Sequence, residues 1–220
     1  MQNEMKIKAA LFDLDGVVFD TESQYTKFWK EIGLKYRPDV ESFEYRIKGM
    51  TMKQIFEKFF AGMEDELPKI IDSIDKYEEK MHYDYVAGVP SFVEDLRKNG
   101  VRTAIVTSSN QAKMASVYRQ RPALKVLFDE ILTSEDFPES KPSPDCYLKA
   151  AARFGLLPNH CVVFEDSFNG LKSGRASGAY VIGLSTTNKP SDIQPFCDFV
   201  LSDFSDVNTQ KLNEIIVASE

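Results

Sequence analysis

The sequence predicts an α/β fold, a doubly wound parallel sheet with an α-helical segment inserted after its first strand. From residue 87 to the C-terminus, short apolar segments alternate with helical patterns. Alternation of this length indicates parallel strands joined by right-handed crossovers, with helices on both faces. The stretch from 19 to 86 shows only helical periodicity. We therefore expect a core of residues 1–18 and 87–220 and a helical cap of residues 19–86.

Each core strand is expected where a short apolar run lies between turn signals. These strands are Lys6–Leu14, Arg102–Thr107, Phe128–Leu132, Val162–Glu165, Val181–Leu184 and, as a short edge strand, Phe199–Leu201. The core helices are expected at Ser91–Lys98, Gln111–Arg119, Pro144–Phe154, Phe168–Ser177 and Thr209–Ala218. Asn99-Gly100 ends the first of them, because glycine commonly follows a helix C-terminus.

The cap segment carries three apolar stripes at helical spacing. They are Tyr25, Phe28, Trp29 and Ile32, then Ile55, Phe56, Phe59 and Phe60, then Ile70, Ile71, Ile74 and Tyr77. We interpret these side chains as the core of a small helical bundle rather than as a cofactor site. Because the bundle follows the end of the first strand directly, we expect it to cover that end as a lid.

Composition bounds the class of protein. A chain of 220 residues that is 43% hydrophobic and contains 16 Phe can bury a substantial core. Its net charge of −7 argues against a nucleic-acid or anionic-membrane partner. Met1–Lys8 is polar and lacks the apolar stretch expected of a signal peptide, and no run of about 18 apolar residues follows. We expect a cytoplasmic protein, a monomer or weak oligomer, that binds a small molecule.

The residue inventory leaves a carboxylate as the expected nucleophile. Cys146, Cys161 and Cys197 are far apart and form neither a C-x-x-C pair nor the Cys-x₅-Arg loop of cysteine phosphatases. His82 and His160 are the only histidines, which gives a Ser-His-Asp triad little to work with. No G-x-x-x-x-G-K-[ST] loop occurs, which disfavours an NTPase.

Asp13-Leu14-Asp15-Gly16 follows the apolar run of the first strand. Residues two apart on a strand point the same way, so Asp13 and Asp15 can both face a pocket beyond the carboxyl end of the strand, where ligands bind in open α/β sheets. Two carboxylates so close repel each other unless a cation lies between them or one holds a proton. The alternative interpretation is an ordinary strand followed by an acidic turn, since Asp and Gly are common turn residues. The pattern Asp-x-Asp-Gly-x-x-x-Asp favours a Mg²⁺-dependent phosphoryl-transfer site.

Candidate phosphate-binding and metal-binding residues follow the later strands. Thr107, Ser108, Ser109 and Asn110 offer hydroxyl and amide donors where a helix begins, which is a natural anion site. Taken alone, this cluster would indicate only a helix cap.

Two further groups follow the third and fourth strands. Lys141 lies in Ser-Lys-Pro-Ser-Pro-Asp, and its ammonium could pair with both Asp13 and a phosphate. Glu165-Asp166 leaves the fourth strand, and carboxylate oxygens are the ligands that Mg²⁺ prefers.

Together these four segments resemble the motifs of the haloacid dehalogenase-like superfamily, closest to the subfamily of β-phosphoglucomutase and phosphoglycolate phosphatase. The resemblance implies a Rossmann-like core with a helical cap and an aspartyl-phosphate mechanism. It implies that Asp13 is the nucleophile and a Mg²⁺ ligand, and that Asp15 is the general acid and base and binds Mg²⁺ through its backbone carbonyl. Thr107 and Lys141 would hold the phosphoryl group, and Glu165 and Asp166 the metal.

The resemblance is weak in the cap, where the expected substrate-binding residues are Thr21, Tyr25, Gly49, Met52 and Lys53, together with Ser108, Ser109 and Asn110 of the core. Tyr25 and Met52 stand where β-phosphoglucomutase has a histidine and an arginine. These departures favour a phosphatase that hydrolyses a small phosphorylated metabolite, such as a sugar phosphate, over a mutase. Arg46, Lys48 or Lys53 could replace the missing charge, so the mutase remains the alternative.

A phospho-aspartate signalling receiver is a remote alternative. Receivers also combine an aspartate, a Thr or Ser, a lysine and an acidic pair on a parallel sheet. Here the acidic pair follows the fourth strand rather than the first, and Asp15 with a lid would hydrolyse the phosphoryl group that a switch must retain. The identity of the substrate is not encoded in any motif.

Overall fold

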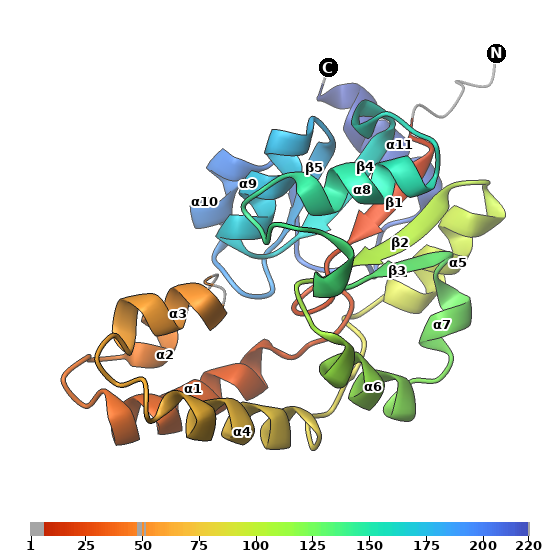
Figure 1. Ribbon diagram of the computed structural model, residues 1–220. Coiled ribbons are helices and arrows are strands. Elements are labelled where there is room, and N and C mark those ends of the chain that lie inside the picture. Colours follow the sequence, from red (N-terminus) through yellow and green to blue (C-terminus); the bar gives the residue numbers. More distant parts are fainter. Residues whose placement is uncertain (1–6, 48–49, 51, 220) are drawn as a thin grey trace, which may run out of the picture.

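A computed structural model of the protein describes residues 7–47, 50 and 52–219, and its core is one parallel six-stranded sheet (Figure 1). The strand order is β3-β2-β1-β4-β5-β6. The strands are β1 (Ala9–Phe12), β2 (Arg102–Val106), β3 (Glu130–Leu132), β4 (Cys161–Glu165), β5 (Tyr180–Leu184) and β6 (Phe199–Leu201). β1 lies between β2 and β4, so the chain leaves the centre in both directions and creates a switch point beside β1.

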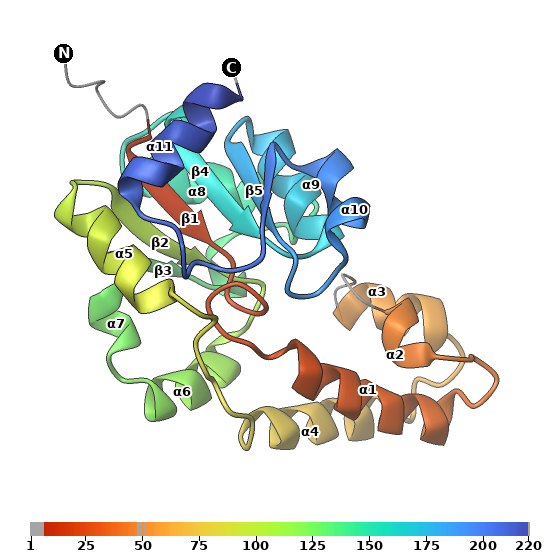
Figure 2. The ribbon, with the colours of Figure 1, turned by 180° about the vertical axis from the view of Figure 1, so that it is seen from behind.

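Helices cover both faces of the sheet, as the sequence predicts. The core helices are α5 (Val89–Lys98), α6 (Gln111–Gln120), α7 (Leu124–Leu127), α8 (Asp145–Arg153), α9 (Phe168–Ser177), α10 (Pro190–Ile193) and α11 (Thr209–Ala218). Figure 1 shows α8 and α9 on one face, and Figure 2 shows α5 and α11 on the other. Among the described residues, no helix combines the length and apolar character needed to span a bilayer.

Alternation along β1 divides the apolar core in two. Ala10 and Phe12 join the cluster under α5 and α11, while Ala9 and Leu11 join the cluster under α8 and α9. All four side chains are fully buried, as expected for the central strand of a parallel sheet.

The inserted segment forms α1 (Glu22–Tyr36), α2 (Phe43–Arg46), α3 (Met52–Phe59) and α4 (Leu67–Glu78). These helices lie beyond the carboxyl ends of the strands (Figures 1 and 2). The predicted stripes supply most of their separate apolar cluster, including Phe28, Trp29 and Ile70. Ile71 is the exception, because 42% of its surface is exposed.

Two antiparallel linkers join the cap to the core. Phe19 pairs with Tyr85, the Asp20 N–H donates to the Asp84 carbonyl over 2.9 Å, and the Val86 N–H donates to the Val18 carbonyl over 3.0 Å. The return linker ends at Gly88, whose φ is +83° and where a Cβ would lie 2.3 Å from the Phe204 carbonyl. Only glycine fits this position without displacing backbone.

The structure differs from the predicted elements at helix ends and short segments. β1 ends at Phe12, so Leu14 lies in the loop beyond it, while Lys6 lies outside the described residues. α5 begins two residues earlier than expected, with Pro90 in its first turn. α7 and α10 were not predicted, because four residues are about one turn and show no periodicity.

Candidate active site

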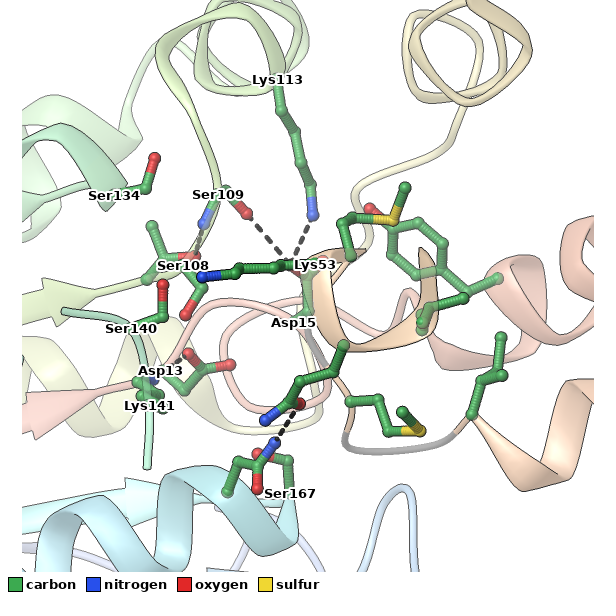
Figure 3. A pocket seen from close by; sticks show the side chains of 18 of the residues that line it. Asp13, Asp15, Lys53, Ser108, Ser109, Lys113, Ser134, Ser140, Lys141 and Ser167 are labelled. Atoms are coloured by element: carbon green, nitrogen blue, oxygen red, sulfur yellow. Dashed lines mark hydrogen bonds and ion pairs between the residues drawn. The ribbon is translucent and has the colours of Figure 1, made fainter. Parts of the chain in front are cut away.

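The register of the sheet brings the predicted catalytic segments together. Phe12 of β1 pairs with Ile105 of β2 and Phe164 of β4. The residues that follow Phe12 and Phe164 therefore lie side by side at the carboxyl edge of the sheet, which places Asp13 beside Glu165. Asp13, Asp15, Thr107, Lys141 and Asp166 all line one cavity of about 1070 Å³ between core and cap. Figure 3 shows Asp13, Asp15 and Lys141 in this cavity.

Lys141 is the centre of the buried charge network. Its Nζ donates to Asp13 Oδ1 over 2.6 Å, to Glu165 Oε1 over 2.6 Å and to the Val106 carbonyl over 3.0 Å. Burial disfavours the ammonium, but the carboxylates of Asp13 and Glu165 outweigh it and hold the pKa of Lys141 well above its usual value. Lys141 is therefore a fixed cation beside Asp13.

Glu165 is fully buried and saturated with hydrogen-bond donors. Its Oε1 accepts from Lys141 and from the Tyr147 hydroxyl at 2.8 Å. Its Oε2 accepts from the N–H of Asp166 at 3.1 Å and from the Ser167 hydroxyl at 3.2 Å. The absence of a side chain at Gly170 makes room for this carboxylate, since a Cβ there would lie 1.8 Å from it.

Asp166 directly follows β4, and its carboxylate lies next to Gly16 in the loop after β1. Its Oδ2 accepts a hydrogen bond from the Thr187 hydroxyl, and its backbone carbonyl accepts one from Asn188 at 2.9 Å. Burial, with the nearby charges of Glu165 and Asp13, raises the pKa of Asp166 well above its usual value.

The carboxylates fit a hard divalent cation. Ligand oxygens of Asp13, Glu165 and Asp166 lie within 4.8 Å of one another. Burial raises the pKa of Asp13 to about 7, with Lys141 opposing and Glu165 adding to the shift. An added positive charge would relieve this repulsion, and oxygen-only sites suit Mg²⁺.

Asp15 is held by three donors. Thr21 Oγ1 donates to Oδ1 over 2.7 Å. Ser109 Oγ donates to Oδ2 over 3.3 Å, and the Lys113 ammonium pairs with Oδ2 (Figure 3). Sequence reasoning missed Lys113, because a lysine inside a helix is normally solvated. Here only 5% of its surface is exposed.

The segment after β2 serves both the cavity and the helix that follows. Asn110 caps α6 by accepting from the Lys113 N–H at 2.9 Å, so the helix-cap interpretation is correct for this residue. Thr107 is buried and its hydroxyl accepts from the Ser109 N–H at 3.0 Å, which leaves the hydroxyl hydrogen to donate. Ser108 and Ser109 line the cavity.

Only some of the predicted substrate-binding residues of the cap line the cavity. Tyr25, Met52 and Lys53 line the cavity, and Lys53 extends from α3 into it (Figure 3). Thr21 is fully buried and contacts Asp15 instead, outside the cavity lining. Gly49 lies outside the described residues.

Of the cations considered as replacements for the mutase arginine, Arg46 is exposed, donates to the Glu41 carbonyl over 2.9 Å and does not line the cavity. Lys48 lies outside the described residues.

Carboxylates dominate the charge of the cap wall. Among the described cap residues that line the cavity, one cation, Lys53, faces four carboxylates, those of Glu22, Glu44, Glu57 and Glu78. Lys53 itself lies 3.9 Å from Glu57 and its side chain is 83% exposed. Apolar side chains, such as Trp29 and Met52, form much of the remaining wall.

Comparison with known proteins agrees with this geometry. The profile of the haloacid dehalogenase-like hydrolases matches residues 7–178. Hexitol phosphatase A of Escherichia coli (strain K12) is 31% identical over 193 residues, which cover 86% of each chain. A β-phosphoglucomutase of Mycobacterium tuberculosis is 25% identical over 241 residues, which cover 92% of each chain.

A solved structure shares the whole fold. The crystal structure of a hydrolase of the same family from Entamoeba histolytica has a TM-score of 0.83 and 24% identity, and the match covers 96% of this chain and 100% of the other. The sheet and the inserted cap are therefore the architecture of known proteins.

Proposed function

Because this chain belongs to the haloacid dehalogenase-like hydrolases, we propose that it is a Mg²⁺-dependent phosphatase that hydrolyses a small phosphorylated metabolite through an aspartyl-phosphate. The observation that carries the proposal is the Lys141 ammonium, buried between Asp13 and Glu165 at 2.6 Å from each. Attack of a carboxylate on a phosphate brings anion to anion, so the chemistry needs a fixed cation at this point.

The residues of the cavity suit the two steps of such a reaction. Asp13 attacks phosphorus and the ester bond breaks, while Asp15 gives its proton to the leaving oxygen. Water then attacks phosphorus in the aspartyl-phosphate, the bond from Asp13 to phosphorus breaks, and Asp15 takes up the proton of the water, which frees Asp13 and inorganic phosphate. The Thr107 hydroxyl and Lys141 hold the phosphoryl oxygens.

The carboxylates of Asp13 and Asp166 and the backbone carbonyl of Asp15 would hold Mg²⁺. Glu165 was expected to bind the metal as well, but its oxygens already accept hydrogen bonds from Lys141, Tyr147 and Ser167, so in this proposal it keeps the other ligands in place. The metal supplies positive charge that offsets the negative charge of the transferring phosphoryl group.

We further propose that residues 19–86 act as a lid on a core of residues 1–18 and 87–220. Closure would exclude water until the leaving group is bound. The contact between Asn169 of the core and Gln54 of the cap, 3.1 Å from Nδ2 to Oε1, supports a closed arrangement.

The substrate that the cavity suits best is a monophosphate whose alcohol is neutral and hydroxyl-rich, such as a sugar or polyol phosphate. Hydroxyls can donate to the carboxylates of the cap wall, whereas a second anionic group would meet, among the described cap residues, four carboxylates and one cation, the exposed Lys53. The similarity to hexitol phosphatase A, whose name specifies a polyol phosphate, supports the same class.

A β-phosphoglucomutase-type mutase is the second candidate, supported by the relative of that name. Burial raises the pKa of Tyr25 well above its usual value, and its hydroxyl donates to Glu78 over 2.7 Å. Tyr25 is therefore poorly suited to the proton transfers that histidine performs. Met52 cannot pair with a second phosphate, which favours hydrolysis.

The test is a screen of phosphate release from about a hundred phosphorylated metabolites with Mg²⁺, run on the wild type and on Asp13→Asn. We expect release from sugar or polyol monophosphates, and background rates for the variant with its fold retained by circular dichroism. Substantial turnover by Asp13→Asn would overturn the proposal. A wild type inactive on every phosphate would do the same.

A further inference from the structure

Lys113 is the buried cation that the proposed steps leave without a role. It lies in α6, and 5% of its surface is exposed. Within the described part of the chain, its ammonium has one ion-pair partner, the Asp15 carboxylate. A buried ammonium is costly unless it is paired and hydrogen-bonded. The position of the Lys113 ammonium therefore depends on the side chains that pack around it.

The cap supplies that closure. The Tyr25 ring of α1 lies over the Lys113 ammonium, with 4.9 Å from Nζ to the ring centroid. The Tyr25 hydroxyl is fixed in turn by Glu78 of α4 at 2.7 Å, and the Tyr83 hydroxyl donates to the Glu78 carbonyl over 2.9 Å. An aromatic face next to a desolvated cation is attractive, so the ring holds the ammonium against Asp15.

The two remaining donors on Asp15 come from different segments. Thr21 ends the linker into the cap and binds Oδ1, while Ser109 of the core binds Oδ2 at 3.3 Å, a long contact for a hydroxyl donor. Without Lys113, Oδ2 would keep only this weak contact. The carboxylate could then rotate away from the leaving group.

We propose that Lys113 is a positioning residue that holds Asp15 in line with the leaving-group oxygen, and that Tyr25 of the closed cap keeps Lys113 there. This inference rests on the proposed phosphatase function. In the affected step, a bond forms from Asp13 to phosphorus and the bond from phosphorus to the alcohol oxygen breaks. The proton that Asp15 took up in the hydrolysis step of the preceding turnover passes to that oxygen, which gives the aspartyl-phosphate and the free alcohol.

Leaving-group dependence is the readout that distinguishes positioning from a merely structural role. A nitrophenolate leaves without a proton, whereas an alkoxide needs one. The values of kcat/KM report the steps up to transfer to Asp13, so they are measured with p-nitrophenyl phosphate and with an alkyl monophosphate that the screen identifies.

We expect Lys113→Met to lower kcat/KM for the alkyl ester at least about tenfold more than for the aryl ester, since general acid catalysis is worth about 10²–10⁴-fold. Lys113→Arg, which keeps the charge, should restore much of the loss. Lys125→Met is the matched control, because it removes another lysine next to a tyrosine ring, 4.1 Å from Tyr118, on an exposed part of the core. It should leave both rates unchanged.

Equal loss for the two esters, or no loss, in an active enzyme would overturn the role of Lys113 and leave the phosphatase function standing. Absence of turnover by the wild type on every ester would instead overturn the phosphatase function, and the proton-delivery role with it. Circular dichroism and thermal unfolding of each variant identify any loss of fold, and Lys113→Arg then provides the decisive comparison.

The cap half of the proposal has a readout independent of turnover. Trp29 is the only tryptophan of the chain, it lines the cavity from α1, and it is 6% exposed. With Mg²⁺ and inorganic phosphate present, acrylamide should quench Trp29 fluorescence more strongly in Lys113→Met and Tyr25→Leu than in the wild type or Lys125→Met. Identical quenching in all four proteins would overturn the contact between Lys113 and the cap as a closing element.

Discussion

Gly16 and Asp166 are in such close contact that a Cβ on Gly16 would lie 2.1 Å from Asp166 Oδ2. Gly16 also has a φ of +73°, a conformation that L residues rarely adopt. The turn that carries Asp13 and Asp15 away from β1 therefore lies directly against Asp166, a candidate metal ligand that follows β4.

Gly16→Ala should accordingly lower kcat by more than its loss of folding stability accounts for. We expect a loss of about 1–3 kcal/mol of unfolding free energy and a large fall in kcat, because the new methyl group displaces Asp166. Gly155→Ala is the control, since its φ is +67° but nothing lies within 4 Å of the added Cβ. Urea unfolding and steady-state rates compare the two. Equal loss of kcat in both would contradict this explanation.

Chelation should abolish turnover, and Mg²⁺ should restore it, because the closely spaced carboxylates of Asp13 and Asp166 repel each other and the substrate without a cation. Asp166→Ala should raise the Mg²⁺ concentration for half-maximal rate at least about tenfold, since ligand loss weakens a site that has few protein ligands. A Mg²⁺ titration checks both expectations. Full activity in excess chelator would refute the metal assignment.

Asp95 should make stability depend on pH through its bonds to α11. Its Oδ2 accepts from the Thr209 hydroxyl at 2.6 Å and from the Thr209 N–H at 2.7 Å, and these bonds hold the pKa of Asp95 below its usual value. The stabilisation is therefore complete above the unfolded pKa of about 3.9 and is lost as pH falls through the lower folded pKa.

Asp95→Asn should cost about 1 kcal/mol at neutral pH, because the group is partly solvated. The difference from the wild type should shrink below about pH 4. Urea unfolding across a pH series measures it, and a difference that persists unchanged at the acid end would show that the charge of Asp95 is not involved.

β-Glucose 1-phosphate, supplied with its bisphosphate activator, should yield free phosphate and sugar, or nothing, rather than glucose 6-phosphate. The loss of a charge-assisted bond to a second phosphate costs about 1.5–3 kcal/mol, which is roughly ten- to a hundredfold in binding. Coupled assays for phosphate and glucose 6-phosphate separate the outcomes. Efficient isomerisation without phosphate release would overturn the choice and point to Lys48 or Lys53 as the residue that binds the second phosphate.

The sequence predicted the sheet and the meeting of Asp13, Asp15, Lys141 and Asp166 because both follow from local rules. Parallel strands end at one edge, and Asp13, Asp15 and Asp166 follow those ends closely. Lys141 was predicted from the resemblance of its Ser-Lys-Pro-Ser-Pro-Asp segment to a family motif. Tyr147, Thr187 and Lys113 were missed because each becomes functional only through a partner far along the chain. No spacing rule marks such a residue, and a helix interior hides it.

Gly49 and Lys48 lie outside the described residues, so the expectations about them stay predictions. Thr21 was predicted to bind substrate, but its hydroxyl contacts Asp15 and its side chain does not line the cavity. A threonine beside a catalytic loop can face either the ligand or the carboxylate, and here its hydroxyl takes the carboxylate of Asp15.

The paired linkers also bear on how such proteins diversify. The chain leaves the core and returns to it at neighbouring points, with Asp20 bonded to Asp84 across 2.9 Å. No core strand therefore depends on the intervening helices for its order in the sheet. A different helical insert could be transplanted between these two residues, which would change the compounds admitted to the cavity while the phosphoryl-transfer residues of the core stay in place.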